Sequence, residues 1–154
     1  MELLRGITGF RHMGDAPLPT SDVAAFRTHC FTAARLLSGR VSRIESPSDT
    51  AGRNFVSVVL ELPEGRIAVL LNAHYPVVGF AEPLRESDRQ LQFVDIPRLV
   101  EVFRNLGVYR VLEASDLEGS ATGVDSSHLG PAELEQIRYW KPTRVGDLVF
   151  NFWD

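Results

Sequence analysis

The sequence predicts one α+β domain over residues 1–154, built on a largely antiparallel sheet of about five or six strands. Three observations predict this class: two segments carry apolar residues at helical spacing, two neighbouring β-branched runs form a hairpin, and the elements follow the order helix, meander, helix, strand, helix, strand. A chain of this length is also typical of one domain with one core. We therefore expect two main helices, a short C-terminal helix and a final sheet strand.

The first helix is predicted between Thr20 and Gly39. Thr20 or Ser21 can cap its N-terminus, Asp22 suits the positive end of the helix dipole, and Gly39 can end it. Its apolar residues recur at helical spacing, at Val23, Phe26, Cys30, Ala33, Ala34 and Leu37. This stripe is expected to face the core, with Cys30 as a buried thiol.

Residues 54–62 and 66–73 are rich in β-branched side chains and are separated by a short turn that contains Pro63 and Gly65. They are expected to form a hairpin. In its first strand, one face is the better core face because all its members are apolar: Val56, Val58, Leu60 and Leu62.

Further strands are expected at residues 75–81, 91–94 and 108–114. Pro76 would place the first of these at an edge or a bulge, because proline cannot donate to a sheet ladder. The second main helix is predicted between the last two of these strands, at residues 96–106, and Gly107 ends it. The glycine-containing N-terminus, RGITGFRHMGD, has the wrong spacing for a phosphate-binding loop and is expected to form a strand with turns.

The last residues, LVFNFWD, are unusually apolar for a chain end, where most domains fray. A short helix at residues 132–139 should stop before Pro142. Leu148, Phe150 and Phe152 would then point to one side of a strand, and Val149, Asn151 and Trp153 to the other. This pattern predicts a strand buried on both faces within the sheet. The open alternative is a tail that docks into a partner.

Composition and charge exclude several classes. The 44% hydrophobic and 23% charged fractions are typical of a globular protein, and no apolar run is long enough to span a membrane. With 16 basic and 20 acidic residues the net charge is −4, so nucleic acid is not an expected partner, although Arg27, Arg35, Arg40 and Arg43 leave room for a local basic face. The single cysteine and the lack of an apolar leader favour a cytoplasmic protein.

The long polar stretch 115–130 is the first candidate for a site. His128 shares it with Asp116, Glu118, Asp125, Ser126 and Ser127, just before a predicted helix N-terminus. Such a group could bind an anion or a divalent cation, or perform acid/base chemistry. His74, after a strand, is a further candidate. The spacing matches no ligand signature, and Asp, Ser and Gly also occur in loops because they suit turns.

Strong catalytic and nucleotide-binding motifs are absent, and we expect no cofactor and no bound metal. The main hypothesis is a cytoplasmic, non-catalytic protein-binding module, resembling immunity or inhibitor proteins only in size and composition. The alternative is a small enzyme or a ligand- or metal-binding domain with its site at residues 115–130. A homodimer formed through the second strand faces, around Phe55 and Trp153, is compatible with either hypothesis.

Overall fold

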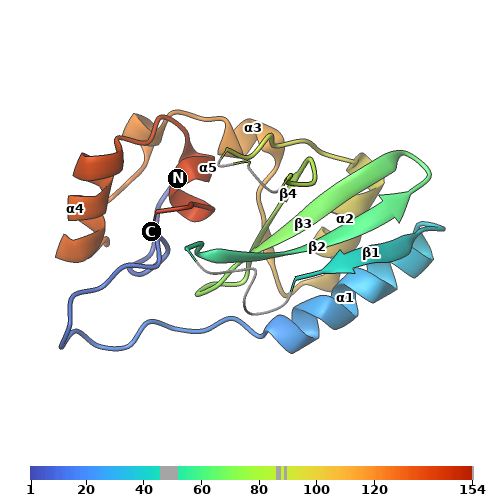
Figure 1. Cartoon of the computed structure of the whole chain (residues 1–154), viewed down its shortest axis with the longest axis horizontal. Helices are drawn as coiled ribbons and strands as arrows, with labels where there is room; N and C mark the ends of the chain where they lie inside the picture. The colour runs from blue at the N-terminus through green and yellow to red at the C-terminus, as the bar shows by residue number, and fades with distance from the viewer. Residues whose placement is uncertain (46–51, 86–87, 89, 154) are drawn as a thin grey trace.

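The computed structural model describes residues 1–45, 52–85, 88 and 90–153, and it confirms the α+β class (Figure 1). The elements are, in order, α1 (Val23–Leu36), β1 (Arg40–Ile44), β2 (Phe55–Leu62), β3 (Gly65–Asn72), β4 (Val77–Ala81), α2 (Pro97–Leu106), β5 (Arg110–Val111), α3 (Ala114–Leu117), the short 3₁₀ helix η2 (Ala121–Gly123), α4 (Pro131–Trp140) and α5 (Val145–Val149). Both main helices and the short helix before the C-terminus lie where the sequence predicts them.

The five strands follow one another in the sheet in chain order, from β1 at one edge to β5 at the other. Neighbours from β1 to β4 are antiparallel, and only the two-residue β5 is parallel to β4. The predicted hairpin is confirmed as β2 and β3, with Val58 opposite Val69 and Leu62 opposite Gly65. Pro76 precedes β4 and donates no hydrogen bond, but its carbonyl accepts one from the backbone N–H of Arg110.

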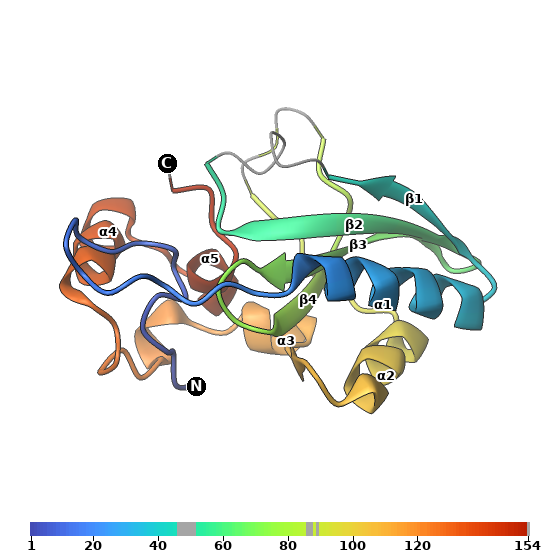
Figure 2. The ribbon, with the colours of Figure 1, turned by 90° about the horizontal axis from the view of Figure 1, so that it is seen from below.

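Helices α1 and α2 cover one face of the sheet (Figure 2). The predicted stripe of α1 is confirmed, since Phe26, Cys30 and Ala33 are fully buried against apolar side chains of β2, β3 and β4. Asp22 is the N-cap, because its carboxylate accepts the backbone N–H of Ala25. Val58 and Leu60 point to this helical face, as expected for the better core face of β2.

The opposite face is covered by segments with little regular structure. The N-terminal residues, the segment around Phe93, the short helices α3 and α5, and the tail after α5 pack on Phe55, Val59 and Leu70 of the sheet. Figure 2 shows α4, α5 and both chain ends gathered at one end of the molecule. Phe55 and Trp153 are buried inside this cluster, so they do not provide the apolar surface expected for a homodimer.

The predicted final sheet strand is wrong. Residues 145–149 form α5, and residues 150–153 follow in no regular structure. The alternating apolar pattern arises because most of these side chains are buried, between the sheet on one side and α4 and the N-terminal segment on the other. A short apolar run fits a buried helix turn or an irregular segment as well as a strand. Gly146 allows α5 to pack closely against Phe93, because a Cβ at position 146 would lie 2.1 Å from the Phe93 ring.

Two smaller expectations also need correction, and one strand was not expected. The N-terminal segment makes one isolated bridge, Glu2 with Asp125, and otherwise forms turns, with Gly6 and Gly9 at φ of 91°. Residues 91–94 form one bridge, between Phe93 and Ala81, and no strand. Strand β1 was not predicted, because RVSRI is short, polar and mostly exposed.

Over the described part of the chain, no helix has the length and apolar character needed to span a membrane.

Candidate functional site

The candidate residues of the 115–130 stretch are held by local structural contacts. Asp116 lies in α3 and accepts the backbone N–H of Glu113, which closes a capping box. The carboxylate of Asp125 accepts the backbone N–H of Ser127, and hydrogen bonds from Ser127 lower the pKa of Asp125. Nε2 of His128 lies 2.9 Å from Oε1 of Glu2. These contacts fix the loop to the N-terminal segment.

His74 lies apart from that loop. Its Nδ1 is 2.8 Å from the carbonyl oxygen of Pro19, and because a carbonyl can only accept, Nδ1–H is the donor. His74 therefore holds the chain that leads into α1. Within the described ranges, no three His, Cys, Asp or Glu side chains lie close enough together to hold a metal ion.

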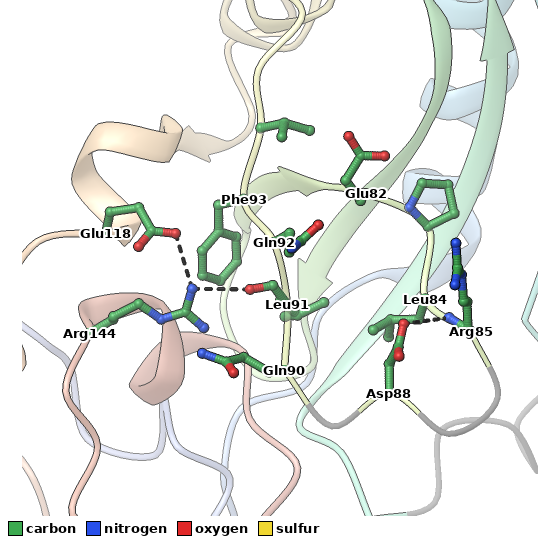
Figure 3. A pocket seen from close by; sticks show the side chains of 12 residues that line it. Glu82, Leu84, Arg85, Asp88, Gln90, Leu91, Gln92, Phe93, Glu118 and Arg144 are labelled. Atoms are coloured by element: carbon green, nitrogen blue, oxygen red, sulfur yellow. Dashed lines mark hydrogen bonds and ion pairs between the residues drawn. The ribbon is translucent and has the colours of Figure 1, made fainter.

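A pocket of about 810 Å³ opens beside the segment that follows β4 (Figure 3). Its described lining is polar on most sides: Glu82, Pro83, Leu84, Arg85, Asp88, Gln90, Leu91, Gln92, Phe93, Val94, Glu118 and Arg144. This lining includes no Ser, Thr, Cys, His, Lys or Tyr, so carboxylates are its only acid/base groups. It can bind a polar or cationic group, and the carboxylates of Glu82, Asp88 and Glu118 are the only groups of its described lining that could act as nucleophiles.

Arg144 is the most firmly held side chain in this pocket. Its guanidinium donates to Asp147 at 2.7 Å, to Glu118 at 3.0 Å and to the carbonyl of Leu91 at 3.0 Å, and it lies over the ring of Phe93. Burial opposes its charge, but the hydrogen bonds and charges of Asp147 and Glu118 raise the pKa of Arg144. The positive charge is thus balanced within the protein, and Arg144 joins α5 to the wall of the pocket (Figure 3).

A second pocket, of about 540 Å³, lies next to the first and shares Gln90 and Leu91 with it. Its walls are the end of α4 and the C-terminal tail: Trp140, Lys141, Pro142, Thr143, Asp147, Phe150, Asn151, Phe152 and Trp153. None of His128, Asp125, Asp116 or His74 is among the lining residues of either pocket. We call it the tail pocket.

Four aromatic side chains meet beside the tail pocket, and we call Phe10, Tyr139, Trp140 and Trp153 the aromatic cluster. The rings of Trp140 and Trp153 are parallel to within 5°, with centroids 6.4 Å apart. Tyr139 packs edge-on against Trp140 at 5.2 Å, and Phe10 lies 6.4 Å from Trp153. Tyr139 is 75% exposed and Trp140 40%, whereas Trp153 is 9% exposed. The cluster is thus anchored by a buried ring and ends in exposed ones.

Buried amides hold the tail that carries Trp153. The backbone N–H of Asn151 donates to Oδ1 of Asn54 at 2.7 Å, and the side-chain amide of Asn151 donates to the carbonyl of Thr8 at 3.0 Å. Asn54 and Asn72 each donate from Nδ2 to the carbonyls of Ile7 and Val149, at 2.8–3.0 Å. Two carbonyls of irregular backbone are thereby satisfied inside the core.

Glu133 fixes α4 in the same way. This fully buried carboxylate accepts the backbone N–H groups of Gly6, Thr8 and Gly130 and the hydroxyl of Thr8, at 2.6–3.1 Å. The glycine-containing N-terminal turn does bind an anion, but that anion is a carboxylate of the protein itself. Tyr75 adds a hydrogen bond from its hydroxyl to the carbonyl of Arg5.

Sequence reasoning missed Asn54, Asn72, Asn151 and Glu133 as a group. Their one shared signal is position, because the asparagines lie at strand ends or in the tail and the glutamate lies in the first turn of a helix. Such residues are also common as turn and cap residues, so their joint role appears only in the fold. Comparisons of the chain with models of protein families, with curated proteins and with solved structures found no match.

Proposed function

We propose that this chain is a cytoplasmic, non-catalytic protein-binding module of the immunity or inhibitor type, which binds its partner through the aromatic cluster and the tail pocket. The observation that supports the proposal most is the exposure of Tyr139 and Trp140 beside a pocket. Tyrosine and tryptophan are enriched among the residues that contribute most to protein binding, particularly next to pockets that can receive a partner side chain.

The support beneath the cluster adds to this argument. Trp140 stacks on the buried ring of Trp153, and its indole N–H already donates to Gln136 at 2.9 Å. A surface whose side chains are held in place before binding loses less conformational entropy when it binds. The aromatic cluster can therefore bind a partner with a small loss of conformational entropy.

The location and the lack of catalysis rest on the chemistry of the side chains. Cys30 is free and buried, and burial raises the pKa of its thiol, so it remains a protonated apolar group. The described linings of the two pockets contain no cysteine, histidine or serine, and the one threonine, Thr143, has no histidine beside it in the tail pocket. These features suit a binding protein of a reducing compartment.

Affinity capture with matched variants tests the proposal. The wild-type chain, the double variant Tyr139→Ala/Trp140→Ala and the control Val108→Ala would be immobilised and exposed to extract of the source cells. Val108 is 53% exposed and lies outside the cluster. We expect one protein to be retained by the wild type and by the control and lost from the double variant. Identical retention by all three chains, or no retained protein, would contradict the proposal.

The polar pocket of Figure 3 supports a second candidate function, a small ligand-binding domain or enzyme. Native mass spectrometry of the purified chain, compared with the denatured chain, distinguishes the two. Extra mass that disappears on denaturation would indicate a bound small molecule or ion, and Glu82→Gln and Glu118→Gln would then test the pocket, with His128→Ala and Asp125→Ala testing the 115–130 loop. A bare monomer or dimer is the result expected for the binding module.

A further inference from the structure

Strand β1 is the edge strand of the sheet on the side of β2. It pairs with β2 alone, and no other described segment forms a backbone hydrogen bond with Arg40–Ile44. Four of its five residues are exposed, and Ile44 presents an apolar side chain that is 39% exposed. The unpaired N–H and C=O groups of such an edge are able to pair with one more strand.

A stripe on α1 runs beside this edge. Arg27, Phe31 and Arg35 are spaced four residues apart, so they share one face of the helix. The guanidinium of Arg27 donates to the carbonyl of Glu45, the residue after β1, at 3.1 Å. Helix α1 and strand β1 are joined by a short connection and run in opposite directions (Figure 1), so the last turn of α1, which contains Arg35, is close in sequence to the start of β1.

The edge and the stripe carry positive charge that the described carboxylates do not neutralise. Arg40 is paired with Glu61 at 2.5 Å, and buried Glu45 is paired with Arg53 at 2.5 Å. Arg27, Arg35 and Arg43 have no ion pair with a carboxylate among the described residues. This patch is basic although the whole chain has a net charge of −4.

The charge decides what can occupy the edge. A second copy of the chain would bring Arg40 and Arg43 of each copy onto one pair of strands, and like charges across a strand pair are destabilising. A single-stranded nucleic acid would satisfy the charge but would leave the backbone N–H and C=O groups of the edge unpaired. An extended acidic peptide satisfies both.

We infer that an acidic, extended segment of a partner protein adds to β1 as a sixth strand, with its carboxylates against Arg27 and Arg35 of the α1 stripe; Arg43, opposite Val59, lies on the other face of the sheet. Alternate side chains of an added strand point to one face, so acidic residues at every second position can meet the α1 stripe. Main-chain hydrogen bonds supply affinity in this mode of recognition, and the arginines supply the choice of partner. This interface is distinct from the aromatic cluster, because α4, which ends at Tyr139 and Trp140 of that cluster, lies at the other end of the molecule (Figure 1).

The test is an NMR titration of the full chain with synthetic peptides. The probe is a blocked peptide, Glu-Thr-Glu-Val-Glu-Thr-Glu. Its first control replaces each Glu with Lys. The second replaces the central Val with Pro and N-methylates the Glu that follows it, which keeps all four charges and removes one N–H donor from each edge of the peptide. The third is a short oligothymidylate. We expect the acidic peptide to shift the amide signals of Arg40–Ile44, and the lysine and proline peptides to bind at least about tenfold more weakly.

Charge-reversal variants complete the test. Arg35→Glu should weaken the acidic peptide about tenfold. Arg138→Glu, the same charge change on exposed α4, should leave binding within about twofold. Both sites are exposed, and an unchanged unfolding midpoint verifies that each variant folds.

Four results would overturn the inference. They are no shift of the β1 amides, equal binding of the proline peptide, equal binding of the oligothymidylate, and an equal effect of Arg138→Glu and Arg35→Glu. None of these results depends on the aromatic cluster, so the inference and the proposed function can fail separately.

Discussion

The two faces of the sheet are built by different means. On one face, α1 and α2 bury a continuous apolar cluster, and each helix satisfies its own backbone by internal hydrogen bonds. On the other face, the N-terminal segment, two short helices and the tail bury an equally apolar cluster, but their irregular backbone needs other partners. Five buried polar residues take part in the hydrogen bonds that satisfy this backbone: Thr8, Asn54, Asn72, Glu133 and Asn151.

The difference shows what irregular structure requires in a core. Buried N–H and C=O groups without hydrogen bonds are costly, so a loop can be packed inside only if side chains complete its hydrogen bonding. Asn54 and Asn72 do this for Ile7 and Val149, and Glu133 does it for Gly6 and Thr8. The result is a firm support for the aromatic cluster without a helix or strand beneath it.

The largest effect is expected from Glu133→Ala. The substitution leaves the N–H groups of Gly6, Thr8 and Gly130 without their acceptor, and we expect a loss of about 4 kcal/mol in the free energy of unfolding. Urea unfolding measures it. Glu135→Ala on the same helix is the control, because Glu135 is half exposed and should cost less than about 0.5 kcal/mol. Similar losses for both variants would contradict the role of Glu133.

On the helical face, Leu99→Ala should cost about 3 kcal/mol, because Leu99 is fully buried in α2 and its removal leaves a cavity. The matched control is Leu36→Ala, which removes the same atoms from a residue that is 66% exposed. Thermal and urea unfolding compare the two. If the exposed leucine cost as much as the buried one, the packing of this face would be misassigned.

A double-mutant cycle tests the shared carbonyls of the irregular face. Asn54 and Asn72 both donate to Ile7 and Val149, so either single change to Ala leaves each carbonyl one donor, and the double change leaves none. We expect the double variant to lose about 1.5 kcal/mol more than the sum of the single losses. Additive losses would show that the two amides act independently.

Tyr109 gives the helical face a pH dependence. Burial and the nearby Cys30 and Asp22 raise the pKa of Tyr109 from 10.0 to about 12. Because the pKa of Tyr109 is higher in the folded chain than in the unfolded chain, protonated Tyr109 contributes its full stabilisation below pH 10. This contribution is lost as the pH rises toward 12. The unfolding free energy should therefore fall more steeply over this interval in the wild type than in Tyr109→Phe. Parallel pH profiles would contradict the shift.

The smallest effect is expected from Tyr139→Ala, because that side chain is 75% exposed. The unfolding free energy should change by less than about 0.5 kcal/mol, although the proposed function requires the same variant to bind its partner less well. Unfolding and capture measured on one preparation separate these effects. A large loss of stability would place Tyr139 in the core and not on a binding surface.

Sequence patterns predicted the helical face well and the irregular face poorly, for physical reasons. The apolar spacing in α1 and α2 and the β-branched hairpin are local patterns, so α1, α2, β2 and β3 could be predicted from them. The hydrogen bonds of Asn54, by contrast, join residues that are 47 and 95 positions apart. No local pattern encodes such pairs, and the tail was therefore predicted as a strand.

The candidate site shows the same limit. The sequence indicates His128, Asp125 and Asp116 because they share a polar loop, but the loop uses them in a contact with Glu2, a turn and a helix cap. The aromatic cluster joins Phe10 with Trp140 and Trp153, which lie at opposite ends of the sequence. Only the fold brings these rings together.

Native-state amide hydrogen exchange tests the central claim most directly, which is that side-chain amides hold the C-terminal tail as firmly as a sheet would. The amide of Asn151, bound to Oδ1 of Asn54, is the reporter, and amides of β2 and β3 are the reference. We predict that Asn151 exchanges only by global unfolding, with the same free energy as the sheet amides. Exchange near the rate of an unprotected chain would mean that the tail frays, and would remove the support for the aromatic cluster.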